Sequence, residues 1–493
     1  METQRKLRPV MFVGTSSDVG KSIVTAGFCR IFKQDGYHPA PFKAQNMSLN
    51  SYATPEGLEI GRAQAVQAEA AGIPCHTDMN PVLLKPTTDK SSQVILNGKS
   101  IGNHTVKEYF MSGDRSVLFE EVKLAYGRLS SRYSPIVMEG AGSISELNLK
   151  KRDITNMRMA LAAGAATYLV TDIDRGGIFA SLYGTMALLE PEEKACIKGI
   201  IINKFRGDPE LFLEGKKIIE DLCKVPVIGI IPYFRDIFIE EEDAVVLRQK
   251  RNQPVEGKVN IAVVLVGRLS NFTDFDRLDR DSRINLYYTH SIAGVSGADI
   301  VILPGSKNTI EDLAALKENG LAGAVKLAYK NGKTVIGICG GYQMMGEWIT
   351  DPLQVESKIG EIAGLGILPV KTELLADKIT SQCTFTYRDF EEKCKGYEIH
   401  MGETVAIGQS KPIAKLEEGG EDGYFLSQKC WGSYLHGILD NQAVINDLVA
   451  PYTSLTVETI DYQQFREEQY DKLAALLREN LDIEQVYQQL QNN

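Results

Sequence analysis

Residues 335–343 constrain the fold of this chain more than any other stretch. They read Val-Ile-Gly-Ile-Cys-Gly-Gly-Tyr-Gln: a short β-branched run that predicts a buried strand, then a cysteine between glycines. Residues 342–348, which follow, are interpreted as a helix. This is the order of a nucleophile elbow with Cys339 in place of serine. Small neighbours allow the sharp turn that exposes the thiol. The backbone N–H of Gly340 can then point into an oxyanion site, and the helix N-terminus favours the thiolate.

A cysteine that ends a strand is equally compatible with an inert core position. Catalysis is favoured by residues 432–437, Gly-Ser-Tyr-Leu-His-Gly, where a second predicted strand ends at His436. A cysteine at one strand end and a histidine at another can form a thiol–histidine pair in an α/β fold. Gly305 lies in a proline–glycine turn after the predicted strand 300–303, and this turn can present a second oxyanion donor.

The N-terminal part of the chain carries a phosphate-binding pattern. Residues 14–22, Gly-Thr-Ser-Ser-Asp-Val-Gly-Lys-Ser, lie between a predicted strand at 9–13 and a predicted helix at 23–32. That context is what a phosphate loop requires, although the spacing is one residue longer than the common G-x-x-x-x-G-K-[ST]. Backbone amides would surround phosphate oxygens at the helix N-terminus, Lys21 would neutralise phosphate charge and Ser22 would hold Mg²⁺. The residues assigned to ATP and phosphate are Gly14, Thr15, Asp18, Gly20, Lys21 and Ser22.

Polar residues also follow three other predicted strands of this half. In an open α/β sheet, ligands bind at the carboxyl ends of the strands, although a solvated loop is the alternative for each cluster. Glu139 ends the predicted strand 136–139 and is well placed as a magnesium-binding or water-ordering carboxylate. The residues assigned to a substrate or phosphoryl site are Lys43, Gln45 and Asn46, after the strand 38–43, and Asp172, Asp174 and Arg175, after the strand 167–171.

Length and composition narrow the class of protein. A chain of 493 residues predicts two or three domains. The sequence contains no run of 18 apolar residues, so no membrane span is expected, and the polar N-terminus is not expected to be a signal peptide. Eight scattered cysteines predict reduced thiols and a cytoplasmic location. A net charge of −10 argues against nucleic acid or an anionic membrane as a partner.

The pattern of elements predicts an α/β protein with two doubly wound, mostly parallel sheets, because apolar strands alternate with helical stretches. We expect a first domain at residues 1–240, a charged linker at 241–257, a second domain at 258–450 and a helical tail at 451–493. Leu473, Leu476 and Leu477 predict a stripe through which the tail docks, and no chemistry is assigned to the tail.

The motifs resemble known families. The strand-elbow cysteine and the late Tyr-Leu-His-Gly resemble class I glutamine amidotransferases. The first half is similar to the dethiobiotin-synthetase-like amidoligases, which share the longer loop and a Glu-Gly-Ala-Gly segment like residues 139–142. Fused in this order, the two halves resemble the cobyric acid synthases of cobalamin synthesis. The strings that carry this resemblance are residues 43–48, 172–177, 203–208, 303–309 and 396–402.

The resemblance implies amidation of the b, d, e and g carboxylates of adenosylcobyrinic acid a,c-diamide, with ATP, Mg²⁺ and glutamine, to give cobyric acid. It also implies nucleotide binding by Asn203 and glutamine binding by Gln343 and His400. The nearest alternative is cobyrinic acid a,c-diamide synthase, which carries an acidic residue where this chain has Gln45 and Asn46. A more distant alternative is a partitioning-type regulatory ATPase.

One departure from the amidotransferase pattern predicts a specific behaviour. Most class I enzymes carry a glutamate two residues after the histidine, and this chain has Ile438 there. Since a thiol needs less help than a hydroxyl, a dyad of Cys339 and His436 is the hypothesis. We expect slow glutamine hydrolysis by this dyad until the ATP and corrinoid sites are filled.

Overall fold

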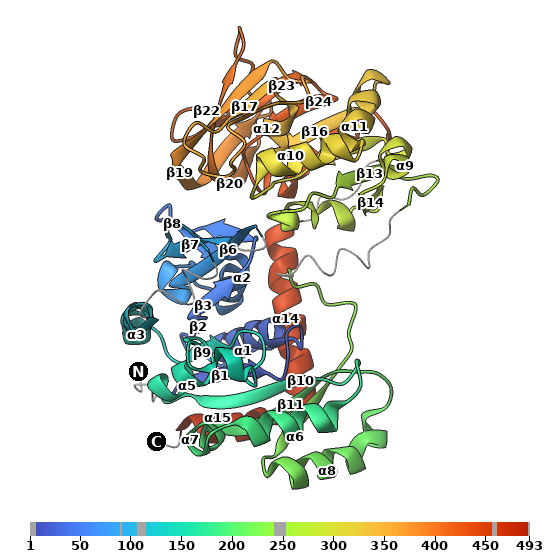
Figure 1. The fold of residues 1–493 in the computed structure, drawn as a ribbon. Coiled ribbons are helices and arrows are strands. Elements are labelled where there is room, and N and C mark those ends of the chain that lie inside the picture. The colour runs from blue at the N-terminus through green and yellow to red at the C-terminus, as the bar shows by residue number, and fades with distance from the viewer. Residues whose placement is uncertain (1–5, 89–90, 106–114, 241–252, 456–460, 492–493) are drawn as a thin grey trace.

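The structure is a computed structural model that describes residues 6–88, 91–105, 115–240, 253–455 and 461–491 (Figure 1). Two sheet-containing parts lie one above the other in this view. The helix α14 runs along the N-terminal part, and its upper end reaches the C-terminal part. The predicted linker at 241–257 lies largely outside the described residues.

The N-terminal sheet has six strands, all parallel, in the order β12-β11-β10-β1-β9-β2. Its strands are β1 (Val10–Gly14), β2 (Ala40–Phe42), β9 (Ile136–Glu139), β10 (Ala166–Asp172), β11 (Ile197–Phe205) and β12 (Val227–Pro232). The helices of this part are α1 (Lys21–Gln34), α2 (Arg62–Ala71), α3 (Arg115–Arg132), α4 (Leu147–Lys150), α5 (Met157–Ala163), α6 (Ile178–Leu188), α7 (Pro191–Cys196) and α8 (Leu213–Cys223).

Burial explains why these strands read as apolar runs. Every residue of β1, β9 and β10 is buried, as expected for parallel strands that are covered on both faces. Figure 1 shows α1 on one side of this sheet and α6 and α8 on the other. Since the strands are parallel, their carboxyl ends meet at one edge, where the polar residues predicted from the sequence gather.

Two small sheets extend this part towards the C-terminal part. One has the order β3-β6-β7-β8, with β3 (Gln45–Met47), β6 (Val82–Thr88), β7 (Ser91–Leu96) and β8 (Lys99–Thr105). The other is an antiparallel pair of β4 (Ser51–Ala53) and β5 (Glu59–Gly61). Neither was predicted from the sequence.

The C-terminal part contains a six-stranded sheet in the order β14-β13-β15-β16-β24-β23, parallel except for the pair of β23 and β24. Its strands are β13 (Val259–Val264), β14 (Ile284–Thr289), β15 (Ile300–Leu303), β16 (Thr334–Ile338), β23 (Tyr424–Ser427) and β24 (Cys430–Ser433). Its helices are α9 (Ile292–Gly297), α10 (Thr309–Glu318), α11 (Leu321–Lys330), α12 (Gly340–Met345) and α13 (Gln442–Val449).

A further, largely antiparallel sheet in this part was not predicted as a sheet from the sequence. It contains β17 (Trp348–Thr350), β18 (Glu361–Ala363), β19 (Val370–Tyr387), β20 (Lys393–Ala406), β21 (Ala414–Leu416) and β22 (Glu421–Asp422). The long strands β19 and β20 pair with each other and reach towards the N-terminal part.

The C-terminal helices pack back onto the first domain. α14 (Tyr462–Asn480) lies against α1, and Leu473 and Leu477 are fully buried there. A Cβ added to Gly27 of α1 would lie 2.2 Å from Leu477 Cδ1, so a larger residue at that position would displace the Leu477 side chain. Burying each leucine contributes about 1.5–3 kcal/mol. α15 (Ile483–Gln491) completes the same core.

The structure confirms the predicted fold class: two α/β parts with mainly parallel sheets and a helical C-terminal segment. The predicted helix at 342–348 is wrong at its C-terminal end, because α12 ends at Met345 and Trp348 begins β17. Gly346 adopts an extended conformation between them, and Trp348 then pairs with Lys371 of β19. Among the described residues, no helix is both long and apolar enough to cross a membrane.

Candidate active sites

The turn between β16 and α12 presents Cys339 in a strained conformation. Its φ of 51° and ψ of −110° are unusual for a residue with a side chain, and such strain is typical of a nucleophile elbow. The turn also needs small neighbours: a Cβ added to Gly341 would lie 1.9 Å from the carbonyl oxygen of Leu303. The Cys339 N–H donates to the carbonyl of Ser433 at 2.8 Å, which fixes the elbow to β24.

His436 follows β24 and has an acidic partner from a distant turn. Its Nδ1 lies 2.7 Å from Asp274 Oδ2, and the N–H of Gly437 donates to Asp274 Oδ1 at 3.0 Å. Asp274 lies in the 3-10 helix η5 (Phe272–Phe275). The Tyr397 ring stacks on the imidazole, with ring centroids 5.3 Å apart. Among the described residues, His436 Nε2 makes no conventional hydrogen bond, so this nitrogen is the one available for proton transfer.

This arrangement corrects the hypothesis of a dyad. Ile438 does occupy the position where an orienting glutamate was expected, but the carboxylate is supplied by Asp274 from another element. The family pattern places the orienting acid two residues after the histidine. Asp274 is 162 positions away from His436 in the chain, so this pattern could not identify it.

The electrostatics of His436 favour the protonated imidazole. Burial alone would lower the pKa of this imidazole, but the negative charges of Asp274 and Cys339 outweigh it and raise the pKa to about 10. The imidazole is therefore protonated near neutral pH, when it pairs with the Asp274 carboxylate.

Of the two glycines predicted as oxyanion donors, Gly305 lies beside His436, and Gly340 lies beside the turn that contains Gly305. A Cβ added to Gly305 would lie 3.4 Å from His436 Cε1, and one added to Gly340 would lie 2.8 Å from the backbone nitrogen of Ser306. The turn at Gly305 and the start of α12 therefore approach each other closely. No larger residue fits at Gly340 without displacing backbone.

Gln343 and His400 border the same region and are held by other side chains. Gln343 accepts a hydrogen bond from Thr309 Oγ1 at 2.9 Å and donates to the Tyr434 hydroxyl at 3.2 Å. The His400 ring stacks on the ring of Tyr434, with centroids 3.8 Å apart, and its Nδ1 lies 2.8 Å from the carbonyl of Gly402. These contacts bring both residues to the nucleophile, and their role in glutamine binding stays a prediction.

The second candidate site is a cavity of about 1410 Å³ in the N-terminal part. It contains the loop at residues 14–22, which follows β1 and precedes α1. Gly20 has a φ of 97°, and a Cβ added to it would lie 2.1 Å from Asn203 Nδ2. Asn203 in turn donates to the carbonyl of Val19 at 2.8 Å, so it supports the loop backbone. Lys21 folds back over the loop and donates to the carbonyls of Ser16 and Gly142, each at 3.0 Å.

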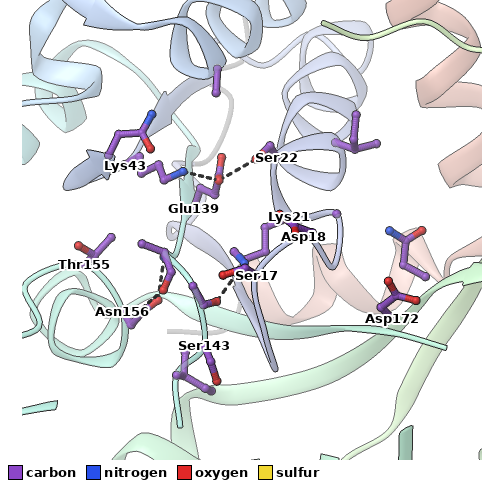
Figure 2. A pocket seen from close by; sticks show the side chains of 18 of the residues that line it. Ser17, Asp18, Lys21, Ser22, Lys43, Glu139, Ser143, Thr155, Asn156 and Asp172 are labelled. Atoms are coloured by element: carbon purple, nitrogen blue, oxygen red, sulfur yellow. Dashed lines mark hydrogen bonds and ion pairs between the residues drawn. The ribbon is translucent and has the colours of Figure 1, made fainter. Parts of the chain in front are cut away.

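Glu139 is the centre of the polar network in this cavity (Figure 2). Its Oε1 accepts hydrogen bonds from Ser22 Oγ at 2.9 Å and Lys43 Nζ at 2.8 Å, and its Oε2 accepts one from Gln67 Nε2 at 2.6 Å. Burial favours the neutral acid, but the Lys43 ammonium and the hydrogen bonds from Gln67 and Ser22 hold the pKa of Glu139 below its usual range. The carboxylate is therefore ionised.

The other predicted residues lie around this network. The rim holds an acidic and basic cluster in which Asp172 Oδ2 pairs with Lys204 Nζ at 3.0 Å and Arg175 lies near both Asp18 and Asp172. Asp174 pairs instead with the exposed Arg206. Thr15 donates to Thr171 at the base of the loop, and Asn46 donates to Gln64. The predicted residues that line the cavity are Asp18, Gly20, Lys21, Ser22, Lys43, Gln45, Asn46, Glu139, Asp172, Asp174, Arg175 and Asn203.

Sequence analysis missed three residues in these sites. Asp274 lies in a short turn with no strand directly before it, so the search for polar residues at strand ends passed over it. Gln67 is one of several glutamines and alanines in α2, and nothing in that pattern singles it out. Tyr397 entered the sequence analysis only as part of residues 396–402, which resemble the family. Its aromatic side chain, three positions before His400, is a signal that could have identified it.

Comparison with known proteins assigns both halves. Residues 10–245 match the family described as a CobQ/CobB/MinD/ParA nucleotide binding domain, and residues 260–444 match a CobB/CobQ-like glutamine amidotransferase domain. A cobyric acid synthase of Parabacteroides distasonis is 60% identical over 99% of this chain and 100% of its own length. The chain belongs to the cobyric acid synthase family.

Other members of the family are similar over the same extent. The cobyric acid synthase of Phocaeicola vulgatus is 60% identical over 99% of this chain, and that of Listeria monocytogenes is 46% identical over 97%. Within the family's two domains, Cys339, His436 and Asp274 fall inside the amidotransferase match, whereas Lys21 and Glu139 fall inside the nucleotide-binding match.

Proposed function

We propose that this chain uses ATP and glutamine to amidate the b, d, e and g carboxylates of adenosylcobyrinic acid a,c-diamide, which gives cobyric acid. A carboxylate is a poor electrophile, so it must first be activated by phosphoryl transfer from ATP. Ammonia then displaces phosphate from the acyl phosphate and leaves an amide. The amidotransferase part makes the ammonia, and the nucleotide-binding part activates the corrinoid.

Glutamine hydrolysis is assigned to Cys339, His436 and Asp274. The Cys339 thiolate attacks the side-chain amide carbon of glutamine, and the backbone N–H groups at Gly340 and Gly305 are proposed to stabilise the oxyanion. The His436 imidazolium gives its proton to the departing ammonia. The neutral imidazole then takes a proton from water, which cleaves the thioester and releases glutamate. Asp274 holds the imidazole with Nε2 towards the thiol through both steps.

Phosphoryl transfer is assigned to the loop and its neighbours. Catalysis of such a transfer consists mainly of positioning and charge stabilisation. Lys21 and the backbone amides before α1 are proposed to hold the β and γ phosphates, and Lys43 is proposed to hold the substrate carboxylate or the transferring group. Both lysines already reach the same wall of the cavity, since Lys43 bonds Glu139 and Lys21 bonds the carbonyl of Gly142.

The residues in this cavity fit Mg²⁺. Ser22 Oγ and the ionised Glu139 Oε1 lie 2.9 Å apart, and oxygen donors of these two kinds are the ligands that Mg²⁺ prefers. When bound, the ion would neutralise charge on the ATP phosphates. Gln67 and Lys43 would then keep Glu139 oriented, because they bond the same carboxylate from other directions.

The size and lining of the cavity suit ATP together with a large apolar substrate that carries carboxylates. Its volume of about 1410 Å³ exceeds the range of about 300–1,000 Å³ for ordinary ligand pockets. Away from the loop it is lined by the exposed apolar side chains Met47, Leu149 and Leu161 and by Lys151 and Arg158. We assign the corrinoid to this region. The reaction would take place in the cytoplasm, where ATP and glutamine are abundant.

The observation that carries this proposal is the union, in one chain of this family, of a Cys339–His436–Asp274 arrangement with a phosphate loop that faces Glu139. The test is mass spectrometry of the products when purified protein is given the a,c-diamide, ATP and glutamine. Four successive amidations that require both ATP and glutamine support the proposal. An unchanged a,c-diamide, or amidation of a different corrinoid only, contradicts it.

A further inference from the structure

Asp274, the acid that orients His436, lies in a turn that is hydrogen-bonded to the N-terminal domain. Asn271 precedes η5 in a left-handed conformation, with a φ of 51°, and its Oδ1 accepts a hydrogen bond from the Ser51 N–H at 2.9 Å. In return, Asn50 Oδ1 accepts one from the Phe272 N–H at 3.2 Å. We call these two reciprocal hydrogen bonds the Asn50–Asn271 clasp. Both asparagines are almost fully buried, at 2% and 3% exposure.

The clasp acts on the turn that carries Asp274. Phe272 is the first residue of η5, and Asp274 is its third. A short 3-10 turn has few internal hydrogen bonds, so its position depends on what holds its ends. One end is held by His436 and Gly437, which bond Asp274, and the other is held by Asn50. An amide from one domain therefore helps to place the acid of the other domain's active site.

The same asparagine is joined to the phosphate cavity. The backbone carbonyl of Asn50 accepts a hydrogen bond from the Arg62 N–H at 3.1 Å, and Arg62 is the first residue of α2. One and a half turns later on α2, Gln67 donates to Glu139 at 2.6 Å. A continuous series of hydrogen bonds, helix and turn thus runs from Glu139 to Asp274.

A second contact between the domains lies beside this series. Tyr52 follows Ser51, and its ring lies 4.6 Å from that of Tyr397, which stacks on His436. The Arg62 guanidinium lies over the Tyr52 ring, 4.5 Å from its centre. Aromatic packing therefore covers a face of the imidazole, while Asp274 holds its Nδ1 atom.

We infer that Asn50 and Asn271 are positioning residues for glutamine hydrolysis, and that through them the nucleotide-binding domain sets the orientation of Asp274 and His436. This inference rests on the proposed function, because it assumes that the elbow hydrolyses glutamine for a reaction in the other domain. The expected coupling between the two sites would then depend on the hydrogen bonds of the clasp. The imidazole would be oriented by Asp274, and not unoriented as in a dyad.

The size of the effect follows from what misplacement costs. A displacement of about 1 Å in a catalytic group can lower the rate by about 10²-fold. Loss of one clasp hydrogen bond leaves Asp274 present but less firmly placed. We therefore expect the kcat for glutamine to fall by about 10- to 100-fold, whereas KM changes little because neither asparagine touches the glutamine site.

The test uses full-length protein and three substitutions. Asn50→Ala removes the acceptor for Phe272, and Asn271→Gly removes the acceptor for Ser51 while keeping the left-handed backbone that glycine tolerates. Asn271→Asp keeps a side-chain oxygen in the same place. The matched control is Gln382→Ala, which removes a 2.8 Å hydrogen bond to the carbonyl of Ala53, on the same β4 strand as Ser51. Among the described residues, this hydrogen bond does not involve η5.

Glutamate release is measured with glutamine alone and again with ATP and the a,c-diamide, and amidation is measured with ammonium as the nitrogen source. Asn50→Ala and Asn271→Gly should lose kcat for glutamine and the stimulation by ATP and diamide, but keep ammonium-dependent amidation. Asn271→Asp and Gln382→Ala should behave like wild type. Wild-type kcat in both clasp variants, or an equal loss in Gln382→Ala, would overturn the inference.

The proposed function fails separately. If wild-type protein amidates no corrinoid with either nitrogen donor, the proposed function is wrong, but glutamate release from glutamine alone still decides whether the clasp positions the base. If ammonium-dependent amidation falls together with glutamate release in both clasp variants, the clasp has only a general structural role and the inference is wrong.

Discussion

His436 and Asp274 form a contact of 2.7 Å between an imidazole Nδ1 and a carboxylate Oδ2 that come from opposite ends of the C-terminal domain. In the proposed mechanism, this contact turns a cysteine–histidine pair into a triad. It also joins the active site to the turn that the N-terminal domain holds through Asn50.

Asp274→Asn should severely impair glutamine hydrolysis. The substitution keeps the shape of the side chain but removes its charge, so the imidazole loses its preferred tautomer and the partner that stabilises its protonated form. The loss in a serine triad is about 10⁴-fold, and we expect about 10²- to 10⁴-fold here because a thiol is more easily ionised. Glutamate release measures the effect, with ammonium-dependent amidation as the control. A variant that hydrolyses glutamine at the wild-type rate would show that Asp274 has no catalytic part.

The pH dependence of glutamine hydrolysis should report His436. Asp274 and Cys339 raise the pKa of its imidazole to about 10, so the protonated imidazole is present at lower pH and is lost as the pH rises through about 10. We expect the alkaline limb of kcat/KM near that pH in wild-type protein. In Asp274→Asn the limb should move to lower pH, because an anion that favours the cation has been removed. The same limb in both proteins contradicts this assignment.

Lys21→Ala and Glu139→Gln should each lose ATP-dependent amidation with either nitrogen donor. Removing one charge-stabilising group from a reaction centre typically costs about 2.7–4 kcal/mol, or about 10²- to 10³-fold in rate. Basal glutamate release by Lys21→Ala serves as the control, because Lys21 lies in the other domain and outside the series that joins Glu139 to Asp274. Near-normal amidation from ammonium in either variant would remove that residue from the phosphoryl-transfer site.

Asp440→Asn should stabilise the protein at alkaline pH. Burial raises the pKa of the Asp440 carboxyl to about 8, and its Oδ1 has no hydrogen-bond partner among the described residues. The folded pKa is above the unfolded value of about 3.9, so stability is lost as the pH rises from that value through about 8. Melting temperatures at pH 5 and pH 9 test this. The variant should melt higher than wild type at pH 9, and the difference should be smaller at pH 5. A lower melting temperature at pH 9 would contradict the assignment.

The sequence predicted those parts of the sites that depend on local patterns. The elbow at Cys339 and the loop at Lys21 follow from glycine spacing next to apolar strands, because backbone geometry there allows few residue types. Glu139 followed from its place at a strand end, and its contact with Ser22 agrees with that reasoning. The strands of both main sheets were visible as apolar runs for the same reason.

The remainder depends on contacts between distant segments. Asp274 contacts His436 because η5 lies next to the residues that follow β24, and no local pattern encodes that approach. The Asn50–Asn271 clasp needs two domains to meet. Leu473, Leu476 and Leu477 predicted that the C-terminal helix packs against another part of the protein. The sequence did not show that this part is α1. Of these three leucines, Leu473 and Leu477 are fully buried and Leu476 is partly buried.

The most direct test of the two-site account follows nitrogen from one domain to the other. Wild-type protein and Cys339→Ser are given ATP, the a,c-diamide and glutamine labelled with ¹⁵N in its side-chain amide, with and without a high concentration of unlabelled ammonium, and the corrinoid is weighed by mass spectrometry. We predict that wild-type protein places ¹⁵N in every new amide when glutamine is the only donor. Cys339→Ser should place none there, but should amidate the same carboxylates with unlabelled nitrogen when ammonium is present. Labelled product from Cys339→Ser, or no amidation by that variant with either donor, would contradict the account.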